Sequence, residues 1–418
     1  MQKENLRNRN FLLLIFGQLS SLMGNYTLKF ALSMYVLEQT GSAAVFAALL
    51  SMGLLPTILL SPLGGVLADR ANRRTVMVAL DALSGTAVLL AGLLLLLDHD
   101  IVVIGGLLVV LSVLGAFESP TVQACIPQML TGDALLRGNA AVNQVSAIAG
   151  LAAPFTGSFC YTAFGLLPVL WGTAGCFCLT ALLERFIQLP YRKETDTMEI
   201  REVICRDLAE SARFLYREQP DILKLLLLAA LASTFVAGVV VVGFPFLVRS
   251  VLGLSSQLYA AAESVMGAAA IGGALCVGLL AGRLRPRGLA GILTGFGLCL
   301  FPAGAAFLLP LEPMGRYLVL LLAFAVSQFG CSVFSTYAIS MIQARTPERL
   351  MGKVMSCVFT LSLCAQPLGQ ILYGALFDWC AGEAYWVLLP SGLALCLLGL
   401  GSVRLFRVME EESGRGTP

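Results

Sequence analysis

The feature that most constrains this chain is a series of long apolar segments, separated by short polar stretches. Hydrophobic residues make up 58% of the 418 residues, and charged residues make up only 12%. A typical soluble domain contains about 45–50% of the first class and about 25% of the second. A soluble chain of this length would also need two or three domains with far more polar surface. The composition therefore predicts a protein that lies in a membrane.

A helix crosses the hydrocarbon core of a bilayer, which is about 30 Å thick, with about 20 apolar residues. Twelve segments of the chain are long enough, and the fifth and sixth are divided near Gly165. We therefore predict an all-α membrane protein with twelve transmembrane helices. The predicted spans are residues 11–37, 43–68, 75–97, 101–126, 140–165, 166–189, 221–248, 257–281, 288–311, 315–342, 354–377 and 384–406.

The positive charges indicate how these spans are oriented. The start of the chain, the even-numbered connections with their flanking span ends, and the tail carry 24 of the 27 lysine and arginine residues. Only Arg249 and Arg316 fall in the other connections, and Lys29 lies within a span. Because such residues concentrate on the cytoplasmic side of membrane proteins, we predict that both termini are cytoplasmic.

One long polar segment divides the chain into two halves of six spans. Its apolar residues recur at helical spacing, which predicts an amphipathic helix on the cytoplasmic membrane surface, or else a solvated linker helix. These residues are Ile200, Val203, Ile204, Leu208 and Leu215. The predicted organisation is a first half (1–189), a linker (190–220), a second half (221–407) and a polar tail (408–418).

Several classes of function do not fit this sequence. A net charge of +2 argues against a nucleic-acid partner. The single histidine, His99, cannot supply a histidine-based metal cluster or a catalytic triad. No G-x-x-x-x-G-K-[ST] segment is present, so ATP is not the direct energy source. We therefore expect neither an enzyme nor a bound metal or cofactor, and the cysteines are predicted to be free thiols.

The segment Gly-Val-Leu-Ala-Asp-Arg-Ala-Asn-Arg-Arg at 65–74 has a partial copy, Gly-Leu-Leu-Ala-Gly-Arg-Leu-Arg-Pro-Arg, at 278–287. A shift of 213 residues aligns Gly65 with Gly278 and Arg70 with Arg283. Secondary transporters are commonly built from such repeats, with the substrate site where the repeats meet. The repeat therefore predicts a transporter made of two related halves.

The 65–74 segment resembles the signature loop of the major facilitator superfamily, G-x-L-x-D-R-x-G-R-R, with Asn72 in the second glycine position. Within that superfamily the chain resembles the macrolide and multidrug exporters. The segments that carry this second likeness are Thr40-Gly41-Ser42-Ala43, Phe117-Glu118-Ser119-Pro120, Gly138-Asn139-Ala140, Ile200-Arg201-Glu202 and Gly352-Lys353-Val354. The resemblance implies a monomer among the lipids of a bacterial plasma membrane. It also implies export of amphiphilic, drug-like small molecules by alternating access, in exchange for protons.

The same resemblance assigns a gating role to the loop. It implies that Asp69, Arg70 and Arg73 stabilise the outward-facing state from the cytoplasmic side, and that Gly65 and Arg74 complete the motif. The alternative is a surface ion pair that only sets topology, worth about 1 kcal/mol or less. The second copy retains Gly278, Arg283 and Arg287 but has Gly282 in place of the acid. The gate is therefore predicted to be asymmetric.

Ionisable side chains within spans are costly, about 2.5–3.5 kcal/mol at a helix centre, and therefore mark candidate sites. Glu118, in the fourth span, is a candidate for proton coupling or for binding a substrate cation, or else is an acid with a structural partner. Lys29 and Glu263 could pair across a cavity, although the Lys29 stem could instead reach the outer interface. Asp81 is also a candidate for proton or substrate coupling, but it is expected to be a structural acid near the loop arginines.

Uncharged polar residues and helix breakers complete the candidates. Polar side chains that could line the cavity, or lie at helix contacts, are Gln18, Asn25, Asn143, Gln144, Gln328, Gln366 and Gln370. Gly150, Pro154 and Gly157 partly match a motif that permits helix motion in the exporters. Ser112 stands where proton-coupled exporters commonly carry an arginine.

Two alternative functions remain open. A lysophospholipid or other lipid transporter of the same superfamily would share the architecture and the loop. Lateral openings and a mostly apolar cavity would favour that function. A membrane receptor that binds without transport is the alternative from another class, and a flux assay would separate it from a transporter.

Overall fold

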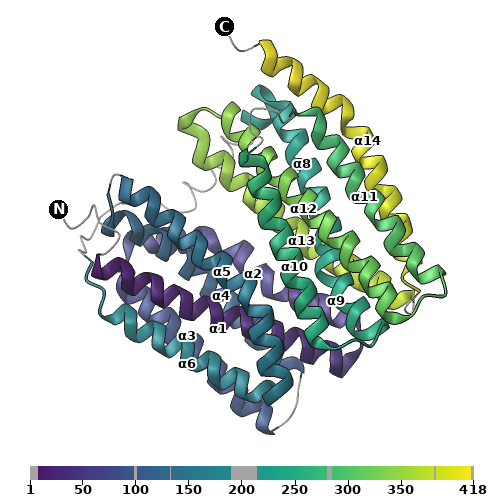
Figure 1. Ribbon diagram of the computed structural model, residues 1–418. Helices are drawn as coiled ribbons and strands as arrows, with labels where there is room; N and C mark the ends of the chain where they lie inside the picture. The colour runs from purple at the N-terminus through teal and green to yellow at the C-terminus, as the bar shows by residue number, and fades with distance from the viewer. Residues whose placement is uncertain are drawn as a thin grey trace. The chain divides into compact units, whose positions relative to one another are not determined.

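The computed structural model describes residues 8–97, 101–131, 133–189, 214–279, 285–380 and 383–415. Every regular element in these ranges is helical, as Figure 1 shows, so the predicted all-α class is confirmed. Helices suit a bilayer because they satisfy their backbone N–H and C=O groups internally where no water is present. The elements are α1 (Arg9–Thr40), α2 (Ala43–Arg70), α3 (Arg73–Leu97), α4 (Ile101–Met129), α5 (Asp133–Phe164), α6 (Leu166–Arg185), η2 (Phe214–Glu218), α8 (Pro220–Phe235), η3 (Val236–Gly243), α9 (Phe244–Phe246), η4 (Leu247–Val251), α10 (Ser256–Leu279), α11 (Arg287–Leu308), α12 (Pro313–Arg345), α13 (Glu348–Trp379) and α14 (Tyr385–Arg415).

Eleven helical runs in the described part of the chain are long and apolar enough to cross a membrane. They correspond to eleven of the twelve predicted spans. The seventh span is the continuous run Pro220–Val251. Along it α8 is followed by the π-helical segment η3, the short α-helix α9 and the π-helical segment η4. Helix α13 covers the predicted span 354–377 but is not among the eleven. The count of twelve spans and the cytoplasmic termini therefore stay predictions.

The predicted division between the fifth and sixth spans is confirmed. Helix α5 ends at Phe164 and α6 begins at Leu166. The residue between them, Gly165, has a φ of 80°, in the left-handed region that a side chain with a Cβ rarely adopts. A single glycine is thus enough to separate two membrane helices.

Large apolar side chains lie exposed along these helices. Leu97, Leu279 and Trp379 are 84%, 86% and 83% exposed. In water, so much exposed apolar surface would drive association, whereas in hydrocarbon it is solvated by lipid tails. The exposed faces therefore fit a lipid environment.

The helices form two compact units. The first unit comprises Met1–Gln39 and Met52–Ile200, and the second comprises Thr40–Ser51 and Arg201–Pro418. Helix α2 therefore begins in the second unit and continues into the first. In the first unit α3 packs against α4 and α6, and in the second α10 packs against α12 and α11 against α14 (Figure 1).

The predicted linker helix lies mostly outside the described residues. Its described end is the π-helical turn Phe214–Glu218. There Leu215 is 4% exposed and belongs to a buried apolar cluster with Ile222 and Leu225 of α8. This end of the linker is therefore anchored in the core of the second unit.

Candidate functional site

A cluster of carboxyl side chains lies inside the first unit. Asp81 on α3 and Glu184 on α6 are both 0% exposed, and their carboxyls lie within hydrogen-bonding reach of each other. Ser21 on α1 donates a hydrogen bond from Oγ to Asp81 Oδ1 at 3.2 Å. Three helices thus bring polar groups together where the surroundings are apolar.

Glu118 on α4 adjoins this cluster. Glu118 is half-buried, and its carboxyl lies near the Ser21 hydroxyl and the Gln18 side chain. Lys29, which is exposed on α1, interacts electrostatically with Glu118. The sequence-predicted coupling residue Glu118 is therefore next to Asp81, with Ser21 between them.

Close approach of α1 and α6 makes the cluster possible. A Cβ on Gly24 would lie 2.9 Å from Cβ of Cys176. Thr180 Oγ1 donates to the Gly17 carbonyl at 3.0 Å, and Thr173 Oγ1 donates to the Gly24 carbonyl at 3.2 Å. Small residues and hydroxyl-to-carbonyl hydrogen bonds are the usual means of holding membrane helices together.

None of the described hydrogen bonds joins a loop arginine to Asp81. Arg73 and Arg74 instead donate to backbone carbonyls of neighbouring helices. Arg73 donates from Nε to the Ala68 carbonyl at 2.7 Å and from Nη1 to the Ala124 carbonyl at 2.8 Å. Arg74 donates to the Arg185 carbonyl. These guanidinium groups satisfy backbone carbonyls in the last turns of α2 and α6 and add a donor to a carbonyl nearer the middle of α4.

The remaining residues of the gating motif lie in different surroundings. Asn72 Oδ1 accepts from the Thr75 N–H at 3.4 Å and caps the start of α3. A Cβ on Gly65 would meet nothing within 4 Å, whereas one on the preceding Gly64 would lie 2.4 Å from the Ala116 carbonyl oxygen. Arg70 is exposed at the end of α2, and the side chain of Asp69 lies outside the described residues.

The second copy of the loop is described only in part. Gly278 lies in α10, and Arg283 falls outside the described residues. Arg287 begins α11 and forms an ion pair from Nε to Glu410 Oε2 on α14 at 2.9 Å. Because its side chain is 56% exposed, this pair contributes little to stability.

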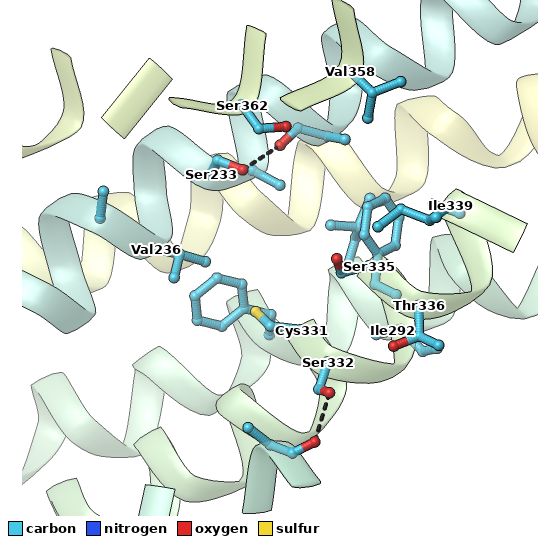
Figure 2. Close-up of a pocket in the computed structure, with 18 of the residues that line it drawn as sticks. Ser233, Val236, Ile292, Cys331, Ser332, Ser335, Thr336, Ile339, Val358 and Ser362 are labelled. Carbon is cyan, nitrogen blue, oxygen red and sulfur yellow. Dashed lines mark hydrogen bonds between the residues drawn. The ribbon is translucent and has the colours of Figure 1, made fainter. Parts of the chain in front are cut away.

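The second unit contains a cavity of about 490 Å³ between α8, η3, α10, α11, α12 and α13. Figure 2 shows Val236, Ile292 and Val358 along it with the hydroxyl groups of Ser335 and Thr336. Two serines have their hydroxyls committed to backbone, since Ser233 donates to the Ala229 carbonyl at 2.9 Å and Ser332 to that of Ala270 at 2.6 Å. No charged residue lines the cavity in the described part of the chain.

The structure distributes the predicted cavity residues over several environments. Gln328 and Gln366 line the cavity of the second unit. Gln370 is 3% exposed and accepts from Ser51 Oγ at 3.0 Å. Asn25 Oδ1 is buried without a hydrogen-bond donor among the described residues. Gln18 belongs to the acidic cluster, and two residues on α5, Asn143 and Gln144, are exposed.

Other predicted residues are placed as follows. On α10, the Glu263 carboxyl accepts from the Tyr259 hydroxyl one helical turn away at 2.6 Å. Pro154 lies inside α5, where a Cβ on Gly157 would approach Phe30 of α1 to 3.0 Å, while one on Gly150 would meet only Tyr26, at 4.0 Å. Close packing against α1 therefore favours glycine at 157.

The backbone N–H groups in the first turn of α2 donate to a side chain that is distant in the sequence. Asp378, at the end of α13, accepts from the Ala43 N–H at 2.7 Å and the Ala44 N–H at 3.1 Å. Ser42 Oγ also donates to Asp378 and accepts from the Val45 N–H at 3.1 Å. The preceding Gly41 has a φ of 60°. All the N–H groups of that first turn are thus satisfied within the second unit.

Sequence reasoning missed Glu184 and Asp378. Glu184 precedes Arg185 at the end of a predicted span, where an acid is usually solvated. Asp378 lies at the end of α13, and its partners are 334 to 336 residues away. The sequence did indicate the partners of Asp378, because the segment Thr40-Gly41-Ser42-Ala43 contains a serine that is typical of a helix start.

Comparisons with known proteins give a family match, related proteins and a similar fold. A family model described as Major Facilitator Superfamily matches residues 14–370. The chain is 27% identical over 424 positions to the multidrug efflux pump Tap of Mycolicibacterium fortuitum, covering 97% of this chain and 98% of that one. It is 23% identical over 402 positions to macrolide efflux protein A of Streptococcus pyogenes, covering 95% and 96%. The crystal structure of a nucleoside transporter variant, NupG, matches with a TM-score of 0.73 at 13% identity, covering 96% of this chain and all of that one.

The Asp378 contact predicts a measurable loss of stability. Replacing Asp378→Ala leaves two backbone N–H groups and a hydroxyl without their charged acceptor, at a cost of about 2 kcal/mol. We expect a lower midpoint of thermal unfolding in detergent. The control is Glu383→Ala, because that exposed carboxylate accepts only from the exposed Tyr385 hydroxyl among the described contacts. Equal midpoints for the two variants would contradict the capping role.

Proposed function

The chain belongs to the Major Facilitator Superfamily and is an integral transporter of the bacterial plasma membrane, and we propose that it exports amphiphilic, drug-like small molecules in exchange for protons. Membership of this superfamily makes it a transporter, which is not a class of enzyme. The names of its relatives, a multidrug efflux pump and a macrolide efflux protein, support export as the direction of transport.

The observation that carries the proposal is the uncharged cavity of the second unit. Its volume of about 490 Å³ falls within the range of about 300–1,000 Å³ that drug-sized ligands occupy. Its lining is mostly Ala, Val, Leu, Ile and Phe, with two glutamines and a few hydroxyls. Such a lining favours a large apolar molecule with a few neutral polar groups over a sugar, a peptide or a multiply charged metabolite, which would need more polar partners.

Proton coupling is supported by the acidic cluster of the first unit. Transport against a gradient needs a group that binds and releases the driving ion. Glu118 is such a group, since it is half-buried and lies beside Lys29, Gln18 and Ser21. Ser112, where the exporters commonly carry arginine, bonds instead to Thr57 Oγ1 at 2.8 Å. The proposed proton route therefore rests on carboxyl groups.

Alternating access is the proposed mechanism. The two compact units, joined by α2 and by the central linker, fit a transporter whose halves rearrange. Asp69 and the loop arginines Arg70 and Arg73 are proposed to stabilise the outward-facing state. A contact that exists in one state only biases the equilibrium by its own free energy.

A lipid transporter is the second candidate, and the mostly apolar cavity is the observation that favours it. Macrolides, fluorescent cations and lysophospholipids should therefore be compared in proteoliposomes whose cytoplasmic protein face points outward. We expect a macrolide to accumulate inside when the lumen is acidic and to equilibrate without the proton gradient. Transport of lysophospholipids alone would identify a lipid transporter, and binding without flux would identify a receptor.

The cavity predicts an effect of Gln366→Leu. This change removes one of two amides from the cavity and leaves its size similar, so a cargo that hydrogen bonds there loses about 1 kcal/mol. The expected result is a rise in KM of roughly 5- to 10-fold for that cargo. The matched control is Gln343→Leu on α12, because Gln343 is exposed and outside the cavity. Identical KM values for all three proteins would place the cargo elsewhere.

The gating loop predicts an effect of Asp69→Asn. Removing the negative charge should weaken the outward-facing state and reduce export while the protein remains inserted and monodisperse. Asp221→Asn serves as a control, since that acid forms a surface pair with Lys224 at 2.7 Å. If the Asp69→Asn variant exports at the wild-type rate, the gating role is contradicted and the loop only sets the topology.

A further inference from the structure

Asp81 and Glu184 carry oxygens that nothing in the described structure satisfies. Both side chains are completely buried. Asp81 Oδ2 and both carboxyl oxygens of Glu184 have no hydrogen-bond donor among the described residues. An unsatisfied buried polar atom costs about 1–3 kcal/mol, and a charged one costs more. Three such atoms at one place therefore need an explanation.

One shared proton accounts for two of these three atoms, one oxygen on each carboxyl. Two ionised carboxylates side by side repel each other, and neither can donate a hydrogen bond. If one carboxyl carries a proton, it becomes a donor to the other, and the contact between Asp81 and Glu184 becomes attractive. The arrangement is therefore that of two acids sharing a proton.

The charged and titratable groups around the pair do not replace that proton. From α4, Glu118 adds a further negative charge, and Cys125 is a buried thiol. Lys29 on α1 interacts with Glu118. Arg73, at the start of α3, donates to the backbone carbonyls of Ala68 and Ala124. The described residues also hold no group of three His, Cys, Asp or Glu placed to bind a metal ion.

Ser21 connects the pair to Glu118. Its hydroxyl donates to Asp81 Oδ1 at 3.2 Å and lies near the Glu118 carboxyl. Gln18, also near Glu118, is 6% exposed, and its Nε2 has no hydrogen-bond partner among the described residues. A polar path thus runs from half-buried Glu118 through one hydroxyl to two fully buried acids.

We propose that Asp81 and Glu184 form a proton-binding site that shares one dissociable proton, and that Ser21 relays protons between this site and Glu118. In the relay, protonated Glu118 gives its proton to Ser21 Oγ while the Ser21 hydroxyl proton passes to Asp81 Oδ1. Glu118 is left ionised and the pair holds the proton, so charge and atoms balance. The role of this site in coupling rests on the proposed antiport, whereas proton binding itself does not.

Infrared difference spectroscopy on the purified transporter tests proton binding without measuring transport. Raising the pH should remove the C=O stretching band of a protonated, buried carboxyl. We expect Asp81→Asn and Glu184→Gln each to abolish the same band, and the double variant to lose no more than either single one. The exposed acid Glu38, replaced in Glu38→Gln, is the control and should leave the band unchanged.

A second variant keeps both acids and tests the relay. Ser21→Ala should retain the band but slow its appearance after a drop in pH. Ser158→Ala removes a buried hydroxyl that has no hydrogen-bond partner in the described structure, and it should exchange at the wild-type rate. A band that survives in both acid variants would overturn the shared-proton site. A band that responds to sodium at constant pH would overturn the proton as its ligand, and equal rates for the two serine variants would overturn the relay.

Discussion

The absence of water in the bilayer core is the constraint on which the rest of this structure depends. Backbone groups must bond within helices, and hydroxyl side chains bond back to carbonyls, as Thr180 does to Gly17. Helix ends find partners as well: Asp378 satisfies the first turn of α2, and Arg73 satisfies two helix carbonyls. Against this background the unsatisfied oxygens of Asp81 and Glu184 stand out, and we attribute them to function.

The division of chemistry between the two units suggests how coupling is organised. The acidic cluster lies wholly in the first unit, and the uncharged cavity lies wholly in the second. We propose that substrate binding and proton binding are linked through conformational change. Helix α2 belongs to both units, and we propose it as one element that carries this linkage, since its first turn is fixed by Asp378 and its last turn ends at the gating loop.

Local signals in the sequence predicted much of the architecture. The lengths of the apolar segments predicted the helices, and Gly165 predicted the break between α5 and α6. Glu118 was a candidate because an acid in a span is costly, but the same rule could not find Glu184, whose helix end lies near the predicted membrane surface. Nor could it show that Asp81 would meet Glu184 rather than the loop arginines, because partners 103 residues apart are chosen by the packing of α3 on α6.

Reciprocal coupling tests the central claim most directly. If export and proton movement are linked, a gradient of a transported macrolide must drive protons the other way without any imposed pH difference. The measurement is the lumenal pH of macrolide-loaded proteoliposomes after dilution, with the membrane potential clamped. The account predicts a change in lumenal pH that depends on the macrolide gradient and is lost in Glu118→Gln. Macrolide efflux through the wild-type protein with no change in pH would contradict it.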